Sequence, residues 1–273
     1  MTQSDRGMPG GVDPEIVSAL DERAREVANG AAVDSKIAAM LALGSIPIAL
    51  GALARDVYGQ APSDVVDVLQ FALLLEYLES DFYLRGLNAP GLIPATDVAV
   101  FTTIGGHEAT HVTALLGLLT GKRATPRSRP TFDFTAKGNL PGFAFLPPQY
   151  ATFTMLAQAF EDTGVRAYKG QAPRLIADKP VLAAALSIHS VEARHASVVR
   201  RLRGKKAWIT GNSRDDLPAF AQGVYDGEEN ATQGGTSLTS IAAKVGGAEG
   251  ATEAFDEPLS MAQVTAIIAP FLP

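Results

Sequence analysis

The chain of 273 residues contains no cysteine, and this absence removes several kinds of site at once. Disulfides, thiolate nucleophiles, iron–sulfur clusters and cysteine-ligated zinc are all excluded. Any metal site must therefore be built from glutamate, aspartate, histidine or tyrosine side chains. The lack of thiols does not distinguish an oxidising from a reducing compartment, because a cysteine-free protein tolerates both.

A surplus of basic residues is also missing. The formal net charge is -6, from 23 lysines and arginines against 29 aspartates and glutamates. Because a nucleic-acid surface needs many basic side chains to neutralise phosphates, we expect no nucleic-acid partner. A local basic cluster lies within residues 200–206, and we interpret it as cationic residues at the C-terminus of a helix.

No apolar segment is plainly a membrane span. Residues 37–54 carry no charge, but they are borderline in length and are interrupted by Gly44, Pro47 and Gly51. We favour a helix buried against the rest of the fold, and the alternative is an export signal or anchor that would give weak membrane association. A long polar stretch precedes the segment where a signal peptide would have a short basic region. The sequence therefore favours a cytoplasmic location over an exported one without deciding between them.

Apolar residues recur at helical spacing in four long segments. The helices are expected from after Pro62, with Ser63 as the cap, to about Leu87, from near Asp97 to near Gly121, from after Pro147-Pro148 to near Gly170, and from after Lys179-Pro180 to near Gly204. The connections at 88–95 and 171–178 are short and suit antiparallel hairpins, whereas residues 122–146 are long and rich in phenylalanine. We predict an all-α, ferritin-like four-helix bundle of two helical hairpins joined by a long crossover that travels along the bundle.

The bundle is expected to have an extension on each side. The predicted organisation is an N-terminal extension at 1–59 with amphipathic and apolar helical segments, the bundle at 60–205, and a C-terminal extension at 206–273. In the C-terminal part we expect Trp208 to pack against a bundle end and residues 226–253 to form a loop. Ser260 is expected to cap a last short helix from Met261 to Ala269.

The four predicted helices carry an internal repeat of polar residues. Each half has a leading Glu, a Tyr seven positions later, and then Glu-x-x-His on the next helix. The members are Glu76, Tyr83, Glu108 and His111 in the first half, and Glu161, Tyr168, Glu192 and His195 in the second. The two Glu-to-Glu separations, 32 positions for Glu76 to Glu108 and 31 for Glu161 to Glu192, nearly match.

This repeat has the composition of a two-metal site. Residues three apart on a helix share a face, so each Glu-x-x-His offers a carboxylate and an imidazole to one place. Four carboxylates and two histidines, directed inward from four helices, are the ligand set of di-iron and di-manganese carboxylate bundles. Two divalent ions would neutralise the four carboxylates, and two carboxylates could bridge ions about 3.5–4 Å apart. The alternative, charges on solvated helix faces, is disfavoured by neighbours such as Leu75 and Phe160.

Several residues near the repeat keep open interpretations. Glu79 could be a seventh ligand, a hydrogen-bond acceptor behind the ligands or an exposed charge, while Asp81 and Asp162 are expected outside the site. Tyr83 and Tyr168 either act at the metals, by bonding a ligand or donating an electron, or are ordinary core tyrosines.

The chain has only four histidines, and all lie in or beside the two motifs. His189 could support a ligand from behind or be a satisfied histidine, and both readings stay open. His107 precedes Glu108 and should point about 100° away from it, so we interpret it as solvated.

These motifs resemble the ferritin-like domain family that includes bacterial desiccation-related proteins and their plant counterparts, and more distantly bacterioferritin and rubrerythrin. The segments that carry the resemblance are FALLLEYLESDFY (71–83), GGHEATHV (105–112), AFEDTGVRAYKG (159–170), SIHSVEARHA (187–196) and AFDEPLSMAQV (254–264). The resemblance implies a metal site at the six Glu and His positions of the repeat. The rubredoxin-like module of rubrerythrin is absent, because it requires cysteines.

Three functions fit this pattern. The first is an iron or manganese oxidoreductase acting on Fe(II), O₂ or H₂O₂, as a ferroxidase, a peroxidase or a catalase-like enzyme. The second is a non-catalytic metal-binding protein that protects under stress or desiccation. The third, an iron-storage cage, is disfavoured by the long extensions and the Pro-rich crossover. A homodimer is left open.

Overall fold

The computed structural model describes residues 63–233, 235–238, 243 and 246–273. The predicted N-terminal extension, with its apolar segment 37–54, lies outside these described residues. Among the helices that are described, none has the length and apolar character needed to cross a membrane.

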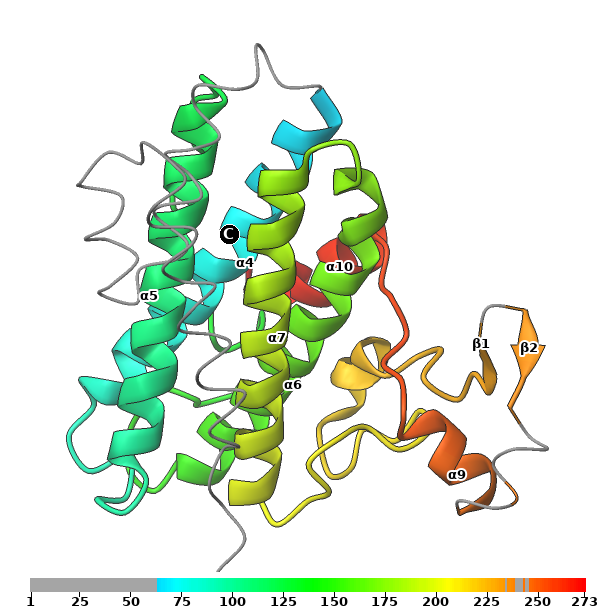
Figure 1. Cartoon of the computed structure of the whole chain (residues 1–273). Coiled ribbons are helices and arrows are strands. Elements are labelled where there is room, and N and C mark those ends of the chain that lie inside the picture. The colour runs from blue at the N-terminus through cyan, green and yellow to red at the C-terminus, as the bar shows by residue number, and fades with distance from the viewer. Residues whose placement is uncertain (1–62, 234, 239–242, 244–245) are drawn as a thin grey trace, which may run out of the picture. The chain divides into compact units, whose positions relative to one another are not determined.

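Four long helices form the bundle, as predicted. They are α4 (Ser63–Leu87), α5 (Val98–Gly121), α6 (Tyr150–Gln171) and α7 (Lys179–Leu202). Figure 1 shows α4 beside α5 and α6 beside α7, each pair forming an antiparallel hairpin. A short 3₁₀ helix, η1 (Ala172–Leu175), lies in the second hairpin connection.

The long crossover gives the bundle its topology. In Figure 1, α5 and α6 run in the same direction because the chain returns along the bundle between them. Its phenylalanines pack on the helices as predicted, and the rings of Phe134 and Phe145 lie 5.5 and 5.6 Å from that of Phe82 on α4. The phenylalanines of the connection between Gly121 and Tyr150 are therefore part of the core.

Polar pairs join the helices at both ends of the bundle. The hydroxyl of Tyr150, at the start of α6, donates to Asp97 at the start of α5, at 2.5 Å. At the opposite end, Lys122 follows α5 and its Nζ lies 2.5 Å from Asp178 Oδ2. Asp178 also caps α7 by accepting from the backbone N–H of Val181, so this helix begins at Lys179 and not after the proline that follows.

The C-terminal extension contains more regular structure than predicted. It comprises η2 (Ala219–Val224), a two-stranded antiparallel hairpin of β1 (Thr232–Gln233) and β2 (Thr236–Ser237), α9 (Gly247–Thr252), α10 (Met261–Ile268) and η3 (Ala269–Phe271). The prediction that 226–253 is all loop is therefore wrong. Ser260 does cap α10, through a reciprocal capping box with Gln263. Trp208 is half-exposed, and its backbone carbonyl accepts from Nη1 of Arg200 in the last turn of α7 at 3.3 Å, so it lies beside the end of the bundle.

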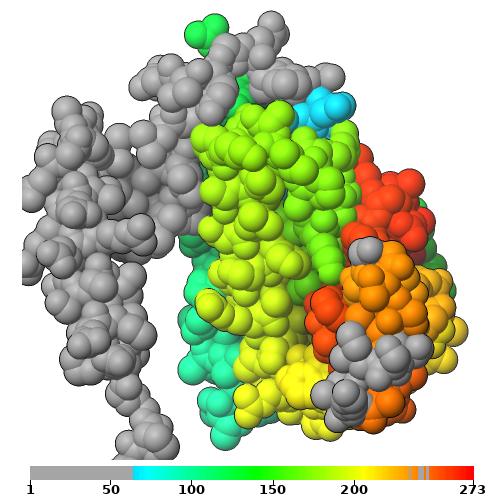
Figure 2. Space-filling model, turned by 45° about the vertical axis from the view of Figure 1, so that its right-hand side comes forward, coloured from blue at the N-terminus to red at the C-terminus, as the bar shows by residue number. Residues whose placement is uncertain are grey.

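The C-terminal segment packs on α6. In Figure 2 its red residues lie against the green surface of this helix. The backbone N–H of Leu259 donates to the carbonyl of Arg166 at 3.1 Å. A Cβ at Gly170 would lie 1.9 Å from the Leu259 carbonyl oxygen, so only glycine permits this approach.

Buried ion pairs fasten the same extension to the second hairpin. Arg166 Nε lies 2.6 Å from Glu228 Oε1, and Arg200 Nη2 lies 2.7 Å from Asp162 Oδ2. Tyr225 of the extension donates to Asp162 at 2.8 Å. Arg200 belongs to the basic cluster predicted at a helix C-terminus, and it does lie in the last turn of α7. Its guanidinium is nevertheless buried and paired, which the sequence did not indicate.

Candidate metal centre

The six Glu and His residues of the repeat converge in the middle of the bundle. The four glutamates are 0% exposed and the two histidines 4% exposed, so the site is sealed from bulk solvent. One glutamate comes from α4, one from α6, and a Glu-x-x-His pair comes from each of α5 and α7. The residues are Glu76, Glu108, His111, Glu161, Glu192 and His195.

These residues form two overlapping groups, each able to surround one ion. Within each group the ligand atoms lie within 4.8 Å of one another. One group consists of Glu76, Glu108, His111 and Glu192, and the other of Glu108, Glu161, Glu192 and His195. Glu108 and Glu192 belong to both groups, so they are the two carboxylates that could bridge a pair of ions.

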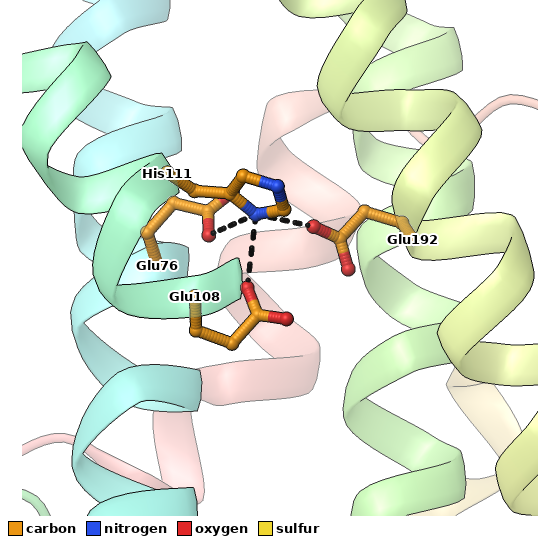
Figure 3. Close-up of side chains that lie close together, drawn as sticks. All are labelled: Glu76, Glu108, His111 and Glu192. Carbon is orange, nitrogen blue, oxygen red and sulfur yellow. Dashed lines mark hydrogen bonds and ion pairs between the residues drawn. The ribbon is translucent and has the colours of Figure 1, made fainter. Parts of the chain in front are cut away.

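His111 is the centre of the first group (Figure 3). Its Nδ1 lies 3.0 Å from Glu108 Oε2, 3.0 Å from Glu192 Oε1 and 3.2 Å from Glu76 Oε2. The three oxygens come from three different helices and converge on one nitrogen.

His195 is the centre of the second group. Its Nδ1 lies 2.8 Å from Glu108 Oε1, 3.3 Å from Glu161 Oε2 and 3.7 Å from Glu192 Oε2. Both shared glutamates thus turn one oxygen toward each histidine. This is the arrangement that two carboxylates would need to bridge two neighbouring ions.

The two tyrosines of the repeat bind the outer carboxylates of the opposite hairpin. Tyr83 on α4 donates from its hydroxyl to Glu161 on α6, and Tyr168 on α6 donates to Glu76 on α4. Each hydroxyl contacts the oxygen of its glutamate that faces away from the histidines. Of the alternatives left by the sequence, the geometry matches the hydrogen bond to a candidate ligand, and this bond ties the two hairpins together.

The pKa shifts within the cluster indicate that it favours a positive charge at its centre. Burial raises the pKa of Glu76 to about 8 and raises that of Glu161 well above its usual range. Burial opposes charge on the histidines too, but the surrounding carboxylates outweigh it, raising the pKa of His195 to about 12 and raising that of His111 well above its usual range. The carboxylates therefore hold positive charge at both Nδ1 positions.

Several carboxylate oxygens of the cluster lack hydrogen-bond donors, and this suits metal ligands. Within the described part of the chain, no hydrogen bond of good geometry reaches Glu161 Oε2, Glu108 Oε1 or either oxygen of Glu192. Buried carboxylate oxygens without donors are costly unless a cation compensates them. Oxygen and imidazole donors in this number suit iron, manganese and other divalent first-row ions.

Glu79 is buried, at 3% exposure, so the interpretation as an exposed charge is wrong. It belongs to neither group of converging ligand atoms. Burial and the neighbouring Glu192 raise the pKa of its carboxyl well above the usual range. Asp81, by contrast, forms an exposed ion pair with Arg85, and Asp162 binds Arg200, so both lie outside the groups as expected.

Gly164 is a residue whose importance sequence reasoning missed. It occupies the place in the second half that Glu79 occupies in the first. A Cβ there would lie 3.3 Å from Glu192 Oε2 and 3.4 Å from Glu79 Oε1. The glycine therefore leaves room for two carboxylates, and the mismatch in the repeat was the signal that could have revealed it.

The structure also describes the surroundings of the two remaining histidines, His107 and His189. His107 is exposed as predicted, but its Nδ1 also lies 2.9 Å from Nε2 of His195 across the bundle, a contact the sequence analysis missed. Burial and His195 lower the pKa of His107. The position of His107 one turn before His111 was the available signal. Nδ1 of His189 is buried and makes no hydrogen bond to the described residues, so this nitrogen supports no ligand.

The fold and the cluster define a class: a four-helix bundle with a buried carboxylate–histidine centre that can hold metal ions. Comparison with protein families identifies it further. Residues 64–205, more than half of the chain, match the ferritin-like domain, and the chain belongs to this family. Among curated proteins, none matches the chain.

Proposed function

We propose that this chain binds two iron or manganese ions and acts as an oxidoreductase on Fe(II), O₂ or H₂O₂. One observation carries the proposal: Glu108 and Glu192 each turn one oxygen toward each histidine. A single-ion site would need only one such oxygen from each carboxylate. The arrangement supports a paired site, as used for two-electron chemistry on oxygen species.

Each ion would have its own pair of terminal ligands. Glu76 and His111 would hold one, Glu161 and His195 the other, with Glu108 and Glu192 between them. When bound, the metal pair supplies the electrons and the Lewis acidity that O₂ or peroxide chemistry requires. The protein supplies a water-excluding site, in which the electrostatic effect of each fixed charge is strong.

Tyr83 and Tyr168 are proposed as the residues that hold protons beside the metals. Each hydroxyl donates to an outer carboxylate, Tyr83 to Glu161 and Tyr168 to Glu76. The bonds fix the orientation of the carboxylates and leave the opposite oxygens free for a metal. Should a tyrosine lose an electron, its proton would have an acceptor already in hydrogen-bond contact.

A second candidate function is non-catalytic metal binding with a protective role under stress or desiccation. The complete burial of the four glutamates supports it, because a sealed site suits a metal that stabilises the bundle. Turnover decides between the two candidates. Repeated conversion of H₂O₂, or of Fe(II) with O₂, would support the enzyme, and stoichiometric binding without turnover would support the protective protein.

Metal content is the first test. The full chain would be purified with excess iron or manganese and its metals counted, beside Glu108→Ala/Glu192→Ala and the exposed control Glu229→Gln/Glu249→Gln. We expect two metals per chain in the wild type and the control, and a loss of both ions in the alanine variant. Less than one metal per wild-type chain, or full loading of the alanine variant, would refute the di-metal site.

The wider context of the protein stays a set of predictions. A homodimer is left open, a cytoplasmic location is favoured over an exported one, and residues 37–54 are expected to form a buried helix, with an anchor that gives weak membrane association as the alternative.

A further inference from the structure

The internal repeat is broken at the position before each Glu-x-x-His. His107 precedes Glu108 in the first half, whereas Val191 precedes Glu192 in the second. The six candidate ligands and the two tyrosines all have counterparts of the same residue type. At this one place an imidazole in one half corresponds to an isopropyl group in the other.

His107 uses its imidazole to contact a candidate ligand on another helix. Its Nδ1 lies 2.9 Å from Nε2 of His195, and the two rings stack with centroids 5.2 Å apart and planes 14° from parallel. His195 turns its other nitrogen, Nδ1, toward Glu108, Glu161 and Glu192. One nitrogen of His195 therefore faces the candidate metal position, and the other is bound by His107.

The direction of this hydrogen bond follows from what metal binding requires. A nitrogen that binds a metal carries no proton, so a metal at Nδ1 of His195 leaves the ring hydrogen on Nε2. Nε2 then donates to Nδ1 of His107, which keeps its own hydrogen on the far nitrogen. The bond holds both the tautomer and the ring plane of His195 in the form that binds a metal.

We propose that His107 is a positioning residue that makes the two metal positions inequivalent. It strengthens the position at His195, while Val191, its counterpart, has no side-chain atom that could hydrogen-bond to His111. The inference rests on the proposed di-metal function. Loss of such a supporting bond typically weakens metal binding about 10- to 100-fold, so the two positions fill in a fixed order.

The test measures each position separately. Glu76→Gln removes a terminal ligand of the His111 position, and Glu161→Gln does the same for the His195 position. In each of these backgrounds, His107→Val gives both halves the same residue, and Co²⁺ binding to the full chain is followed by calorimetry and visible absorption. We expect His107→Val to weaken Co²⁺ binding about 10- to 100-fold in the Glu76→Gln background and to leave it unchanged in the Glu161→Gln background.

Two further variants separate the hydrogen bond from other effects. His107→Asn keeps an acceptor near the place of Nδ1, so it should restore most of the affinity lost in His107→Val. Val191→Ala changes the matched position and should leave Co²⁺ binding as in the parent. Equal weakening of both positions by His107→Val, no weakening of either, or an asparagine variant as weak as the valine one would overturn the proposal.

A readout without metal completes the test. In the metal-free wild type, the hydrogen on Nε2 of His195 should give a protected imidazole resonance by nuclear magnetic resonance, and this should be lost in His107→Val. Its presence unchanged in the variant would contradict the contact. A wild-type chain that binds no Co²⁺ overturns the di-metal function as well, whereas normal two-step binding that is indifferent to residue 107 overturns this inference alone.

Discussion

The two helical hairpins present the same candidate ligands but are supported by different surroundings. The crossover residue Phe134 packs on rings of both hairpins, Phe82 on α4 and Phe160 on α6, whereas the buried ion pairs to the C-terminal extension belong to α6 and α7. Near the centre, Glu79 and His107 of the first hairpin correspond to Gly164 and Val191 of the second. A metal centre can thus have a symmetric set of ligands while the residues behind them, which adjust affinity and stability, differ.

The largest expected effect concerns the buried support of the second hairpin. Arg200→Ala leaves Asp162 buried without its cation, which typically costs about 3–5 kcal/mol of the free energy of unfolding. The partly exposed pair of Arg85 and Asp81 in the first hairpin is the comparison, since Arg85→Ala, which also removes the contact of the guanidinium with the Phe134 ring, should cost about 1–2 kcal/mol. Urea denaturation measures both, with the exposed neighbour Arg201→Ala as a control. Similar losses at Arg85 and Arg200 would contradict the difference between the hairpins.

Removing the metal tests whether ions bound at the centre stabilise the folded bundle. At free metal a hundredfold above its dissociation constant, the bound state gains about 2.7 kcal/mol for one ion. A chelator should therefore lower the thermal midpoint of the wild type and leave that of Glu108→Ala/Glu192→Ala unchanged. An equal decrease in both proteins would show that the chelator acts elsewhere.

The metal-free and loaded forms should respond to pH in opposite directions. In the metal-free form, burial raises the pKa of Glu76 from 4.5 to about 8. The stability contributed by this proton is fully present below pH 4.5 and is lost as the pH rises to about 8. The loaded form should instead lose its metal, and hence its stability, toward low pH, because ligands bind metal deprotonated. Thermal midpoints at pH 5 and 8, with chelator or with excess Mn²⁺, distinguish the two trends.

Removing the hydroxyls of Tyr83 and Tyr168 tests whether the two halves of the repeat contribute equally to stability. Tyr83→Phe and Tyr168→Phe each remove one hydrogen bond to a buried carboxyl group and leave its oxygen without a donor, a loss of about 1–3 kcal/mol. Because the two bonds are reciprocal, we expect nearly equal losses in the free energy of unfolding of the metal-free protein. Tyr77→Phe provides a comparison outside the repeat. A loss in one variant more than twice that in the other would break the symmetry proposed for these bonds.

The smallest effect on the free energy of unfolding is expected at two helical glycines, which should respond differently to alanine. A Cβ at Gly106 would have no neighbour within 4 Å, so Gly106→Ala should stabilise α5 by about 1 kcal/mol. Gly164→Ala places its Cβ against Glu79 and Glu192, so the same gain in helix propensity should be cancelled and metal affinity lowered. Urea denaturation and Mn²⁺ titration measure the two results. Normal metal binding by Gly164→Ala would contradict the role assigned to this glycine.

Features that depend on local sequence could be predicted. Apolar periodicity gave the four helices to within a few residues, because each buries a continuous face. The spacing of Glu108 to His111 and of Glu192 to His195 placed both motifs toward the centre, since residues three apart share a helix face. Ser260 likewise indicated the start of α10, because serine is a preferred N-cap residue.

Features that depend on contacts between distant segments could not be predicted. His107 points away from Glu108 on its own helix, and the proximity of His195 follows only from how α5 and α7 pack. From the sequence alone, Arg200 and Asp162 would be interpreted as two surface charges, because their burial depends on residues after 206 that cover them. Glu108 and Glu192 each turn one oxygen toward each histidine, and these directions depend on side-chain dihedral angles that the sequence spacing does not determine.

The polar pairs at the two bundle ends have a consequence for the spacing of the ions. Asp97 with Tyr150 and Lys122 with Asp178 connect α5 to the second hairpin at both ends, 25 positions apart, or about 37 Å of helix at 1.5 Å per residue. Sliding one hairpin along the other would stretch both pairs together. The longitudinal register of the hairpins is therefore held from outside the centre, and with it the gap between the carboxylates that would span the two ions.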